Sequence, residues 1–315
     1  MPTPPAESEV LAYFEQLSNW GRWGDDDQLG TLNLVTSDKR RAAAALIHEG
    51  VAVSCAWDIV SDSQPDPSFR HPQRIMLLTG DNLEALHWGG EAAFSLDFLG
   101  VAYHGFTVTH LDGLCHAFWA GKMYNGYPAA AVTAREGATQ LGIEALQSGV
   151  VTRGVLLDVA ALKGKDWLEP GEPVYPEDLE AAEERQSVRV EEGDALFLRT
   201  GWGKRKRLPK SQRPSTDGAY PGWHAACLPW FHERGVAMIG ADTGNDAYPS
   251  GYQKLQHPIH SIGMVALGLW HIDNCDLEGL GAAVEHFGRS AFHLSLAPLR
   301  WIGATGCPVN PIALF

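Results

Sequence analysis

Three short apolar segments, separated by segments of helical character, constrain the fold of this chain more than any other feature. Residues 154–159, 195–200 and 236–240 are rich in Val, Leu, Ile, Ala or Phe, and each begins at or just after a glycine or a Gly-Asp turn. Runs this short and this apolar indicate strands that are buried on both faces of a sheet. Residues 176–185 and 223–234 lie between them and are expected to be helices. Alternating strands and helices predict an α/β fold with a central sheet and surrounding helices.

The rest of the chain adds further elements to this pattern. No Pro/Gly/Ser-rich linker interrupts the middle of the 315 residues, so we expect one domain. Residues 10–35 combine Trp, Gly and Asp in a way that favours an irregular segment, and residues 1–35 are interpreted as an N-terminal extension packed on a domain of residues 36–315. Further helices are expected between the cap Ser37 and Gly50 and at 135–147 and 277–287, further strands at 51–60, 94–99, 107–109 and 291–296, and a long loop at 61–75.

The charge of the chain excludes several classes of partner. Lys and Arg number 24 against 38 Asp and Glu, a net charge of −14. A chain this acidic is not a general binder of nucleic acids or anionic membranes, because both require a positive field. No segment approaches the roughly 18 apolar residues of a membrane span. The acidic, Pro-rich start does not resemble a signal peptide, so a cytoplasmic location is expected. The one basic run, residues 203–210, is interpreted as a solvated loop.

The five cysteines do not form a recognisable framework. They are spread along the chain without any C-x-x-C pair. This spacing indicates neither a set of disulfides nor a zinc ribbon. We expect reduced thiols that are mostly buried.

The densest group of potential metal ligands lies between Tyr103 and His116. If residues 104–112 are extended, His104, Phe106, His110 and Asp112 share one face, because side chains alternate along a strand. An imidazole and a carboxylate at positions i and i+2 suit Zn²⁺, Mn²⁺ or Fe²⁺. His116 follows after a glycine and is a candidate for moving a proton to or from a metal-activated water.

A second cluster later in the chain makes a metal site more plausible than one short pattern does. His260 and Asp273 could complete the coordination shell from a distant part of the sequence. His271 is interpreted as a surface group of a helix or loop. His257 precedes a proline, which favours a turn position without a functional role.

Thr109-His110-Leu111-Asp112-x-x-x-His116 resembles the signature H-x-G-T-H-x-D-x-P-x-H of the cyclase family. These metal-dependent hydrolases include kynurenine formamidase, isatin hydrolase and trans-dienelactone hydrolase. Further resemblance extends over nearly the whole chain, at residues 19–24, 29–33, 194–202, 240–243 and 257–277.

The resemblance implies a fold, an assembly and a chemistry. The fold would be a single swivelling β/β/α domain with a mixed central sheet, assembled as a homo-dimer or homo-tetramer. The activity would be hydrolysis of a formamide, cyclic amide or lactone with bound Zn²⁺ or Mn²⁺. By position, His110 and Asp112 match metal ligands and His116 matches the acid/base histidine. Asp273 falls where the family has a ligand Glu, and His260 lies near its other late ligand.

Departures from the family signature affect the expected metal site. Phe106 stands in place of the first motif histidine, Val108 in place of the glycine and Leu114 in place of the proline. The site therefore either lacks one ligand or takes His104 instead. One divalent ion, Zn²⁺ or Mn²⁺, is predicted rather than two.

The resulting hypothesis is hydrolysis by a metal-activated water that attacks a carbonyl, with a small, ring-bearing substrate as the partner. Trp20, Trp23, Trp88 and Phe106 are candidates for the walls of its pocket, although core packing explains the tryptophans equally well.

Two other functions fit the same residues. His110, Asp112 and His260 could form the 2-His-1-carboxylate triad of a non-haem Fe(II) oxygenase, but the α/β pattern argues against the double-stranded β-helix of such enzymes. A non-catalytic protein that binds a metal or ligand would be consistent with Phe106 and Val108 in the motif.

Overall fold

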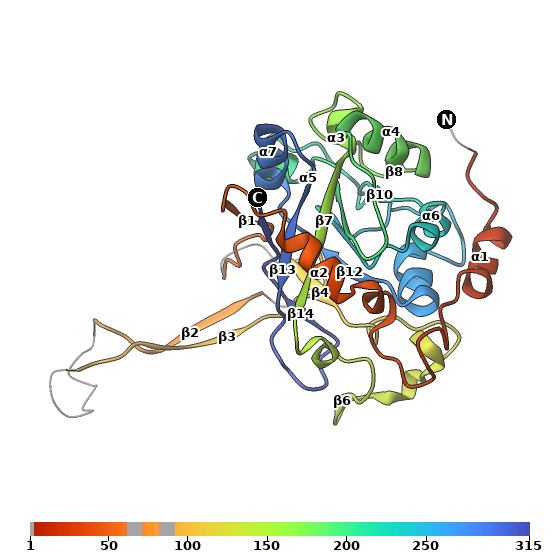
Figure 1. Cartoon of the computed structure of the whole chain (residues 1–315). Helices are drawn as coiled ribbons and strands as arrows, with labels where there is room; N and C mark the ends of the chain where they lie inside the picture. Colours follow the sequence, from red (N-terminus) through yellow and green to blue (C-terminus); the bar gives the residue numbers. More distant parts are fainter. Residues whose placement is uncertain (1–2, 62–70, 82–91) are drawn as a thin grey trace.

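A mixed sheet of nine strands forms the middle of the molecule, and helices pack around it (Figure 1). The computed structural model describes residues 3–61, 71–81 and 92–315. The four strands β7, β9, β11 and β12 run parallel to one another, and the strands on either side of them pair antiparallel. In spatial order the sheet consists of β1 (Ala52–Ser54), β15 (Ile312–Leu314), β13 (Ala291–Leu296), β7 (Val150–Asp158), β9 (Ala195–Arg199), β11 (Met238–Ala241), β12 (Trp270–Asp273), β4 (His110–Asp112) and β14 (Gly306–Pro308).

The central strands β9 and β11 are mostly apolar because both of their faces are covered. In β9, Leu196 and Leu198 belong to one apolar cluster, whereas Phe197 belongs to a second cluster on the opposite face. In β11, Ile239 and Met238 divide between the two clusters in the same way. The α/β fold with one central sheet, expected from these continuous apolar runs, is therefore confirmed.

Different helices cover the two faces of the sheet. The first cluster receives side chains from α1 (Glu7–Gln16), α4 (Pro176–Gln186), α6 (Cys227–Arg234) and the π-helix η7 (Ile259–Leu267). The second cluster includes residues of α7 (Glu278–Phe287) and the segment just before α2 (Ser37–Ala44). No helix of the described residues is long and apolar enough to cross a membrane. The shorter elements are α3 (Val159–Leu162), α5 (Trp202–Arg207), β5 (Val132–Thr133), β6 (Gly137–Ala138), β8 (Pro173–Val174), β10 (Gly222–Trp223), η1 (Gly30–Leu34), η3 (Tyr124–Gly126), η4 (Ala129–Ala131), η5 (Ile143–Leu146) and η6 (Lys210–Gln212).

A two-stranded arm projects from this body. It consists of β2 (Gln73–Leu78) and β3 (Leu96–Gly100), which pair antiparallel and extend away from the sheet, drawn in orange in Figure 1. Apolar side chains of both strands are exposed to solvent; the exposed fraction is 59% for Leu77 and 70% for Leu99. The strand expected at 94–99 is thus confirmed with a small shift. Of the loop expected at 61–75, residues 62–70 lie outside the described residues, and 73–75 belong to β2.

The helix expected at 135–147 is wrong. The segment contains the short strand β6 and the 3₁₀ turn η5 instead. Gly137 has φ of 70° and lies so close to the Gly303 carbonyl that a Cβ would be 2.3 Å from its oxygen. This tertiary contact requires a backbone that a helix does not provide, and it overrides the local preference for helix.

The ends of the chain's first elements also differ from expectation. Residues 7–16 form the helix α1, although most of this segment was interpreted as irregular; its Val10 and Tyr13 pack into the core. The next helix, α2, is capped by the Thr36 hydroxyl, which accepts from the Lys39 amide, and not by Ser37. It ends at Ala44, and the strand expected at 51–60 is reduced to β1.

The basic run at 203–210 is mostly helical, so its interpretation as a solvated loop is wrong. It follows Trp202, the first residue of α5, which is buried. The Arg205 guanidinium lies 4.5 Å from the centre of the Trp202 ring and is itself buried. One face of the run is therefore anchored in the protein, and only part of its charge faces solvent. Of the other expected elements, β13 has the expected ends, and α4, β9 and α7 are confirmed with ends shifted by one residue.

Candidate metal centre

Two neighbouring antiparallel strands carry four ionisable side chains on one face of the sheet. His271 of β12 lies opposite Asp112 of β4, and Asp273 lies opposite His110. Opposed residues of an antiparallel pair point to the same face. All four are buried, with exposed fractions between 0% and 7%. Ile239, the parallel neighbour of His271, belongs to the cluster beneath α6 and η7, so these four side chains lie on the face that those helices cover.

His260 reaches the same face from the π-helix η7. Its Nε2 lies 3.5 Å from Asp112 Oδ2 and 3.5 Å from Asp273 Oδ2. Its ring also contacts that of His271 edge to face, with centroids 4.8 Å apart. π-Helical turns are rare and are frequently found at functional sites. The structure thus brings His260 and Asp273 together with the β4 residues, as the sequence predicts, although their role as ligands stays a prediction.

His104 approaches the centre from the segment before β4. Its Nδ1 lies 2.9 Å from Asp112 Oδ1, and its Nε2 is hydrogen-bonded to the Thr305 hydroxyl at 3.0 Å. Gly306 of β14 leaves room for this ring, because a Cβ there would lie 3.1 Å from His104 Cε1 and 2.6 Å from the Leu111 carbonyl oxygen. The alternative in which His104 takes the place of the missing motif histidine is therefore sterically available.

The extended segment expected at 104–112 is wrong before residue 110. Residues 107–109 are not a strand, and β4 begins at His110. The Asn274 side chain donates to the carbonyls of Gly105 and Val108, and His110 Nδ1 donates to the Val108 carbonyl at 2.9 Å. Side chains therefore occupy carbonyls that a strand would pair with its neighbour, and the chain bends. His104 reaches Asp112 through this bend and not by strand alternation.

His116 lies beside the donors in the turn that follows β4. Its ring stacks on that of His104, with centroids 4.0 Å apart and an interplanar angle of 8°. Burial lowers the pKa of His116 to about 4, which the negative charge of Asp112 only partly offsets. The imidazole is therefore neutral near pH 7 and can accept a proton.

Potential ligand atoms gather in two groups of three among the described residues. His104, His110 and Asp112 form one group and Asp112, His260 and Asp273 the other, with the donor atoms of each group within 4.8 Å of one another. The carboxylate of Asp112 is common to both groups.

The unsatisfied atoms of this cluster fit a cation. Both carboxylate oxygens of Asp112 and Nδ1 of His104 are buried, and none of them makes a hydrogen bond of good geometry, although His104 Nδ1 lies 2.9 Å from Asp112 Oδ1. A buried carboxylate in this condition is costly unless a cation or donors compensate it. Imidazole nitrogens and carboxylate oxygens are the ligands that Zn²⁺ and Mn²⁺ accept. The residues present therefore fit a divalent metal ion.

The ionisation of the two buried carboxylates also favours a bound cation. Burial by itself raises the pKa of Asp112, but His116 and His110 outweigh it and hold that pKa well below its usual value. Burial also opposes ionisation of Asp273, whose pKa is nevertheless lowered by His260. Both carboxylates are thus ionised at neutral pH and carry negative charge into a buried space.

The aromatic residues expected to wall a substrate pocket lie in different places. Phe106 is 44% exposed and its ring lies 4.9 Å from that of Tyr220. The Trp20 indole donates to the Val265 carbonyl of η7 at 2.6 Å, and Trp23 contacts the Arg22 guanidinium. Trp88 lies outside the described residues. A role of these side chains in substrate binding stays a prediction.

Sequence reasoning missed three residues of this region. His271, interpreted as a surface group, is fully buried, and burial lowers its pKa to about 3. Its position two residues before Asp273 could have indicated the shared face, because both lie on one strand. Asn245 and Asp246 hold Asp273 and His260 by hydrogen bonds, and no motif in the sequence indicated them.

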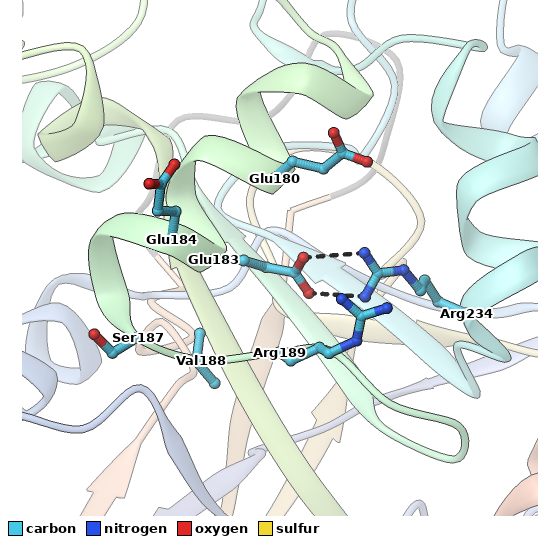
Figure 2. Close-up of a pocket in the computed structure, with 7 residues that line it drawn as sticks. All are labelled: Glu180, Glu183, Glu184, Ser187, Val188, Arg189 and Arg234. Atoms are coloured by element: carbon cyan, nitrogen blue, oxygen red, sulfur yellow. Dashed lines mark hydrogen bonds and ion pairs between the residues drawn. The ribbon is translucent and has the colours of Figure 1, made fainter.

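A depression of about 570 Å³ at the end of α4 lies apart from the metal centre (Figure 2). Figure 2 shows Glu183 facing Arg234 across it, and these two side chains form an ion pair at 3.2 Å. Their charges compensate each other, and no residue of the two donor groups lines this depression. It does not contribute to the candidate site.

Comparison with known proteins identifies the family. The Cyclase family model matches residues 88–245. The crystal structure of a novel cyclase is 34% identical, with a TM-score of 0.88 over 96% of this chain and 99% of that chain. Isatin hydrolase A from Labrenzia aggregata, bound to benzyl benzoate, is 18% identical, with a TM-score of 0.60 over 86% of this chain and 94% of that one. Isatin hydrolase A from Ralstonia solanacearum is 17% identical, with a TM-score of 0.59 over 99% and 98%.

These similarities support different conclusions about fold and family. The two isatin hydrolases share the fold with this chain at low sequence identity. No curated protein matches the sequence. The family model covers half of the chain, and the novel cyclase covers nearly all of it at 34% identity. The chain belongs to the cyclase family.

Proposed function

We propose that this protein is a metal-dependent hydrolase that cleaves a cyclic amide, a lactone or a formamide at its carbonyl carbon. The observation that carries the proposal is the buried carboxylate of Asp112, whose oxygens make no hydrogen bond of good geometry although imidazole nitrogens of His104, His110 and His260 lie 2.9 to 3.5 Å away. Membership of the cyclase family and the likeness to isatin hydrolases support it.

One divalent ion, Zn²⁺ or Mn²⁺, would be held with Asp112 as the common ligand. His104 and His110 would complete the coordination of the ion on one side, or His260 and Asp273 would do so on the other. When bound, such an ion lowers the pKa of water toward neutrality and polarises a carbonyl oxygen. Because two donor groups share Asp112, the number of ions per chain is the measurement that separates a single-ion centre from a two-ion centre.

His116 is proposed to carry the proton in this reaction. It would accept a proton from the attacking water and deliver it to the leaving nitrogen or oxygen. Its stacking on His104 fixes the plane of the ring beside the donors. Its neutral state near pH 7 leaves a nitrogen free to accept the proton.

The substrate is proposed to be a small molecule that bears a ring. A continuous series of ring contacts borders the centre: Phe106 on Tyr220, Tyr220 on Tyr248 and Tyr248 on His257, with centroid distances between 4.9 and 5.5 Å. His257 in turn lies 6.3 Å from His260. Aromatic rings beside a polar centre favour a flat apolar group next to the reacting carbonyl.

A test combines metal analysis with a panel of substrates. Protein purified without added metal is analysed for Zn and Mn, then assayed on cyclic amides, lactones and formanilides before and after chelation. The proposal expects bound metal and chelator-sensitive hydrolysis of at least one class. Bound metal without turnover on the whole panel would instead favour a non-catalytic binding protein.

We also propose that the chain assembles as a homo-oligomer. An isolated two-stranded hairpin is at best marginally stable in water. The arm of β2 and β3 exposes apolar residues on both strands, and an apolar groove of about 890 Å³ at its base is lined by residues such as Phe98 and Trp301. Exposed apolar area of this kind commonly marks a protein interface.

A further inference from the structure

Two consecutive residues, Asn245 and Asp246, lie between β11 and η7. They contact His260 and Asp273, which we call the late donors of the metal centre because they come last in the sequence. Asn245 and Asp246 are both fully buried. The Asp246 carboxylate accepts from the backbone amide of Ile259 at 2.7 Å and from that of His260 at 3.3 Å. It also faces His260 Nδ1 at 2.6 Å. Asp246 therefore binds the first turn of η7 and the side chain that this helix brings to the centre.

The contact with Asp246 determines which nitrogen of His260 faces the metal centre. A carboxylate can only accept, so Nδ1 carries the hydrogen. The other nitrogen, Nε2, then points between Asp112 Oδ2 and Asp273 Oδ2, at 3.5 Å from each. Metal-binding histidines commonly donate their second ring nitrogen to a carboxylate, which fixes the tautomer and the orientation of the ring.

Asn245 holds Asp273 in a corresponding way. Its amide donates to Asp273 Oδ1 at 2.5 Å and to the Ile272 carbonyl at 3.1 Å, while its oxygen accepts from the Trp223 indole at 3.0 Å. Asp273 Oδ2 stays directed toward His260. The backbone of Asn245 has φ of 59°, a left-handed conformation that Asn and Gly adopt more readily than other residues. The side chain of Asn245 therefore receives a fixed direction from both its backbone and Trp223.

We propose that Asn245 and Asp246 are positioning residues that orient His260 and Asp273 toward the cation. In each late donor one polar atom is held by the Asn245–Asp246 pair and the other is presented to the centre. This inference rests on the proposed metal-dependent function. It adds that two consecutive residues set the geometry of two donors that come from different elements, η7 and β12.

Metal affinity tests the inference directly. The metal-free full-length protein competes with a chromophoric chelator for Zn²⁺, and thermal unfolding of the metal-free protein reports folding. Asp246→Asn is expected to bind Zn²⁺ about 10–100-fold more weakly than wild type, the usual effect of losing an outer-shell partner. Asn245→Gly keeps the left-handed backbone accessible, removes the amide and is expected to change affinity in the same direction.

Two matched variants serve as controls. Glu183→Gln removes a buried carboxylate that pairs with Arg234 away from the centre. Asn125→Gly removes another left-handed, hydrogen-bonded Asn, which contacts the Gly21 amide and the Gly24 carbonyl. Both are expected to change unfolding temperature without changing Zn²⁺ affinity. A purely structural role of Asn245 and Asp246 would give the same result for the test variants.

The outcomes separate this inference from the function on which it rests. If wild type binds neither Zn²⁺ nor Mn²⁺, the proposed function fails. If wild type binds and folded Asp246→Asn binds equally well, the positioning role is overturned. Should Asp246→Asn not fold, Asn245→Gly decides, and unchanged affinity there overturns the inference.

Discussion

The imidazoles of His104 and His116 lie face to face, with their centroids 4.0 Å apart. His104 also forms a donor group with His110 and Asp112, whereas neither donor group among the described residues includes His116. We propose that these two neighbouring histidines have different roles, His104 in holding a cation and His116 in moving a proton.

This division predicts the effect of removing His116. His116→Ala is expected to retain metal content and to lose about 10²–10⁴-fold in kcat, the range that a general acid/base contributes. Elemental analysis and steady-state kinetics on the most active substrate of the panel measure both quantities. His286→Ala, at an exposed position on α7, serves as the control and should leave both unchanged. Undiminished turnover in His116→Ala would show that another group moves the proton.

The donors themselves are tested by single alanine substitutions. His104→Ala and His260→Ala remove one donor each from different groups, and both are expected to weaken Zn²⁺ binding by more than about 100-fold, beyond the usual effect of an outer-shell change. Chelator competition measures the affinity. His257→Ala is the matched control, since that ring lies 6.3 Å from His260 and belongs to neither group. Wild-type affinity in either test variant would remove that histidine from the ligand set.

The pH dependence of stability is predicted from a histidine outside the centre. Burial lowers the pKa of His224 to about 4 from the ordinary 6.5. Between these values the unfolded chain binds a proton that the folded chain does not, so the free energy of unfolding decreases as the pH falls from about 6.5 to about 4. Above pH 6.5 this contribution is complete.

The variant His224→Asn isolates this contribution. Asn can still accept the Ala226 amide that His224 Nδ1 accepts at 3.1 Å. Denaturant unfolding at several pH values, with chelator present throughout, is expected to show a shallower pH dependence in the variant than in wild type. Identical slopes would mean that His224 becomes protonated in the folded protein as easily as in the unfolded chain.

The arm predicts an effect of charge on assembly. Leu77→Glu and Leu99→Glu place charges on the two strands of the arm, where wild type exposes apolar side chains. Light scattering coupled to size-exclusion chromatography is expected to show an oligomer for wild type and a smaller species for these variants. Ile47→Glu, at an exposed apolar position outside the arm, should leave the mass unchanged. A monomeric wild type would contradict the proposed assembly.

Local patterns predicted the central part of the fold well, because strands that are buried on both faces of a sheet are rich in apolar residues. Apolar runs mark β9, β11 and the second half of β7, and α4 begins at Pro176, a residue that favours the first turn of a helix. The same patterns failed at residues 135–147, where the contact between Gly137 and Gly303 decides the backbone. They also failed at α5, where the charged residues suggest an exposed loop although Trp202 and Arg205 are buried against each other.

For the site, the sequence by itself determined which donors lie near one another along the chain. His110 and Asp112 occupy alternate positions of one strand, and His116 follows after a short turn, so their proximity is local. His260 and Asp273 were candidates from the sequence, but only the tertiary structure decided that they lie beside Asp112, that His271 is buried next to them, and that Asn245 and Asp246 hold them in place. The physical reason is that pairing of β4 with β12 and the packing of η7 on the sheet create these contacts, and neither leaves a periodic signal in the sequence.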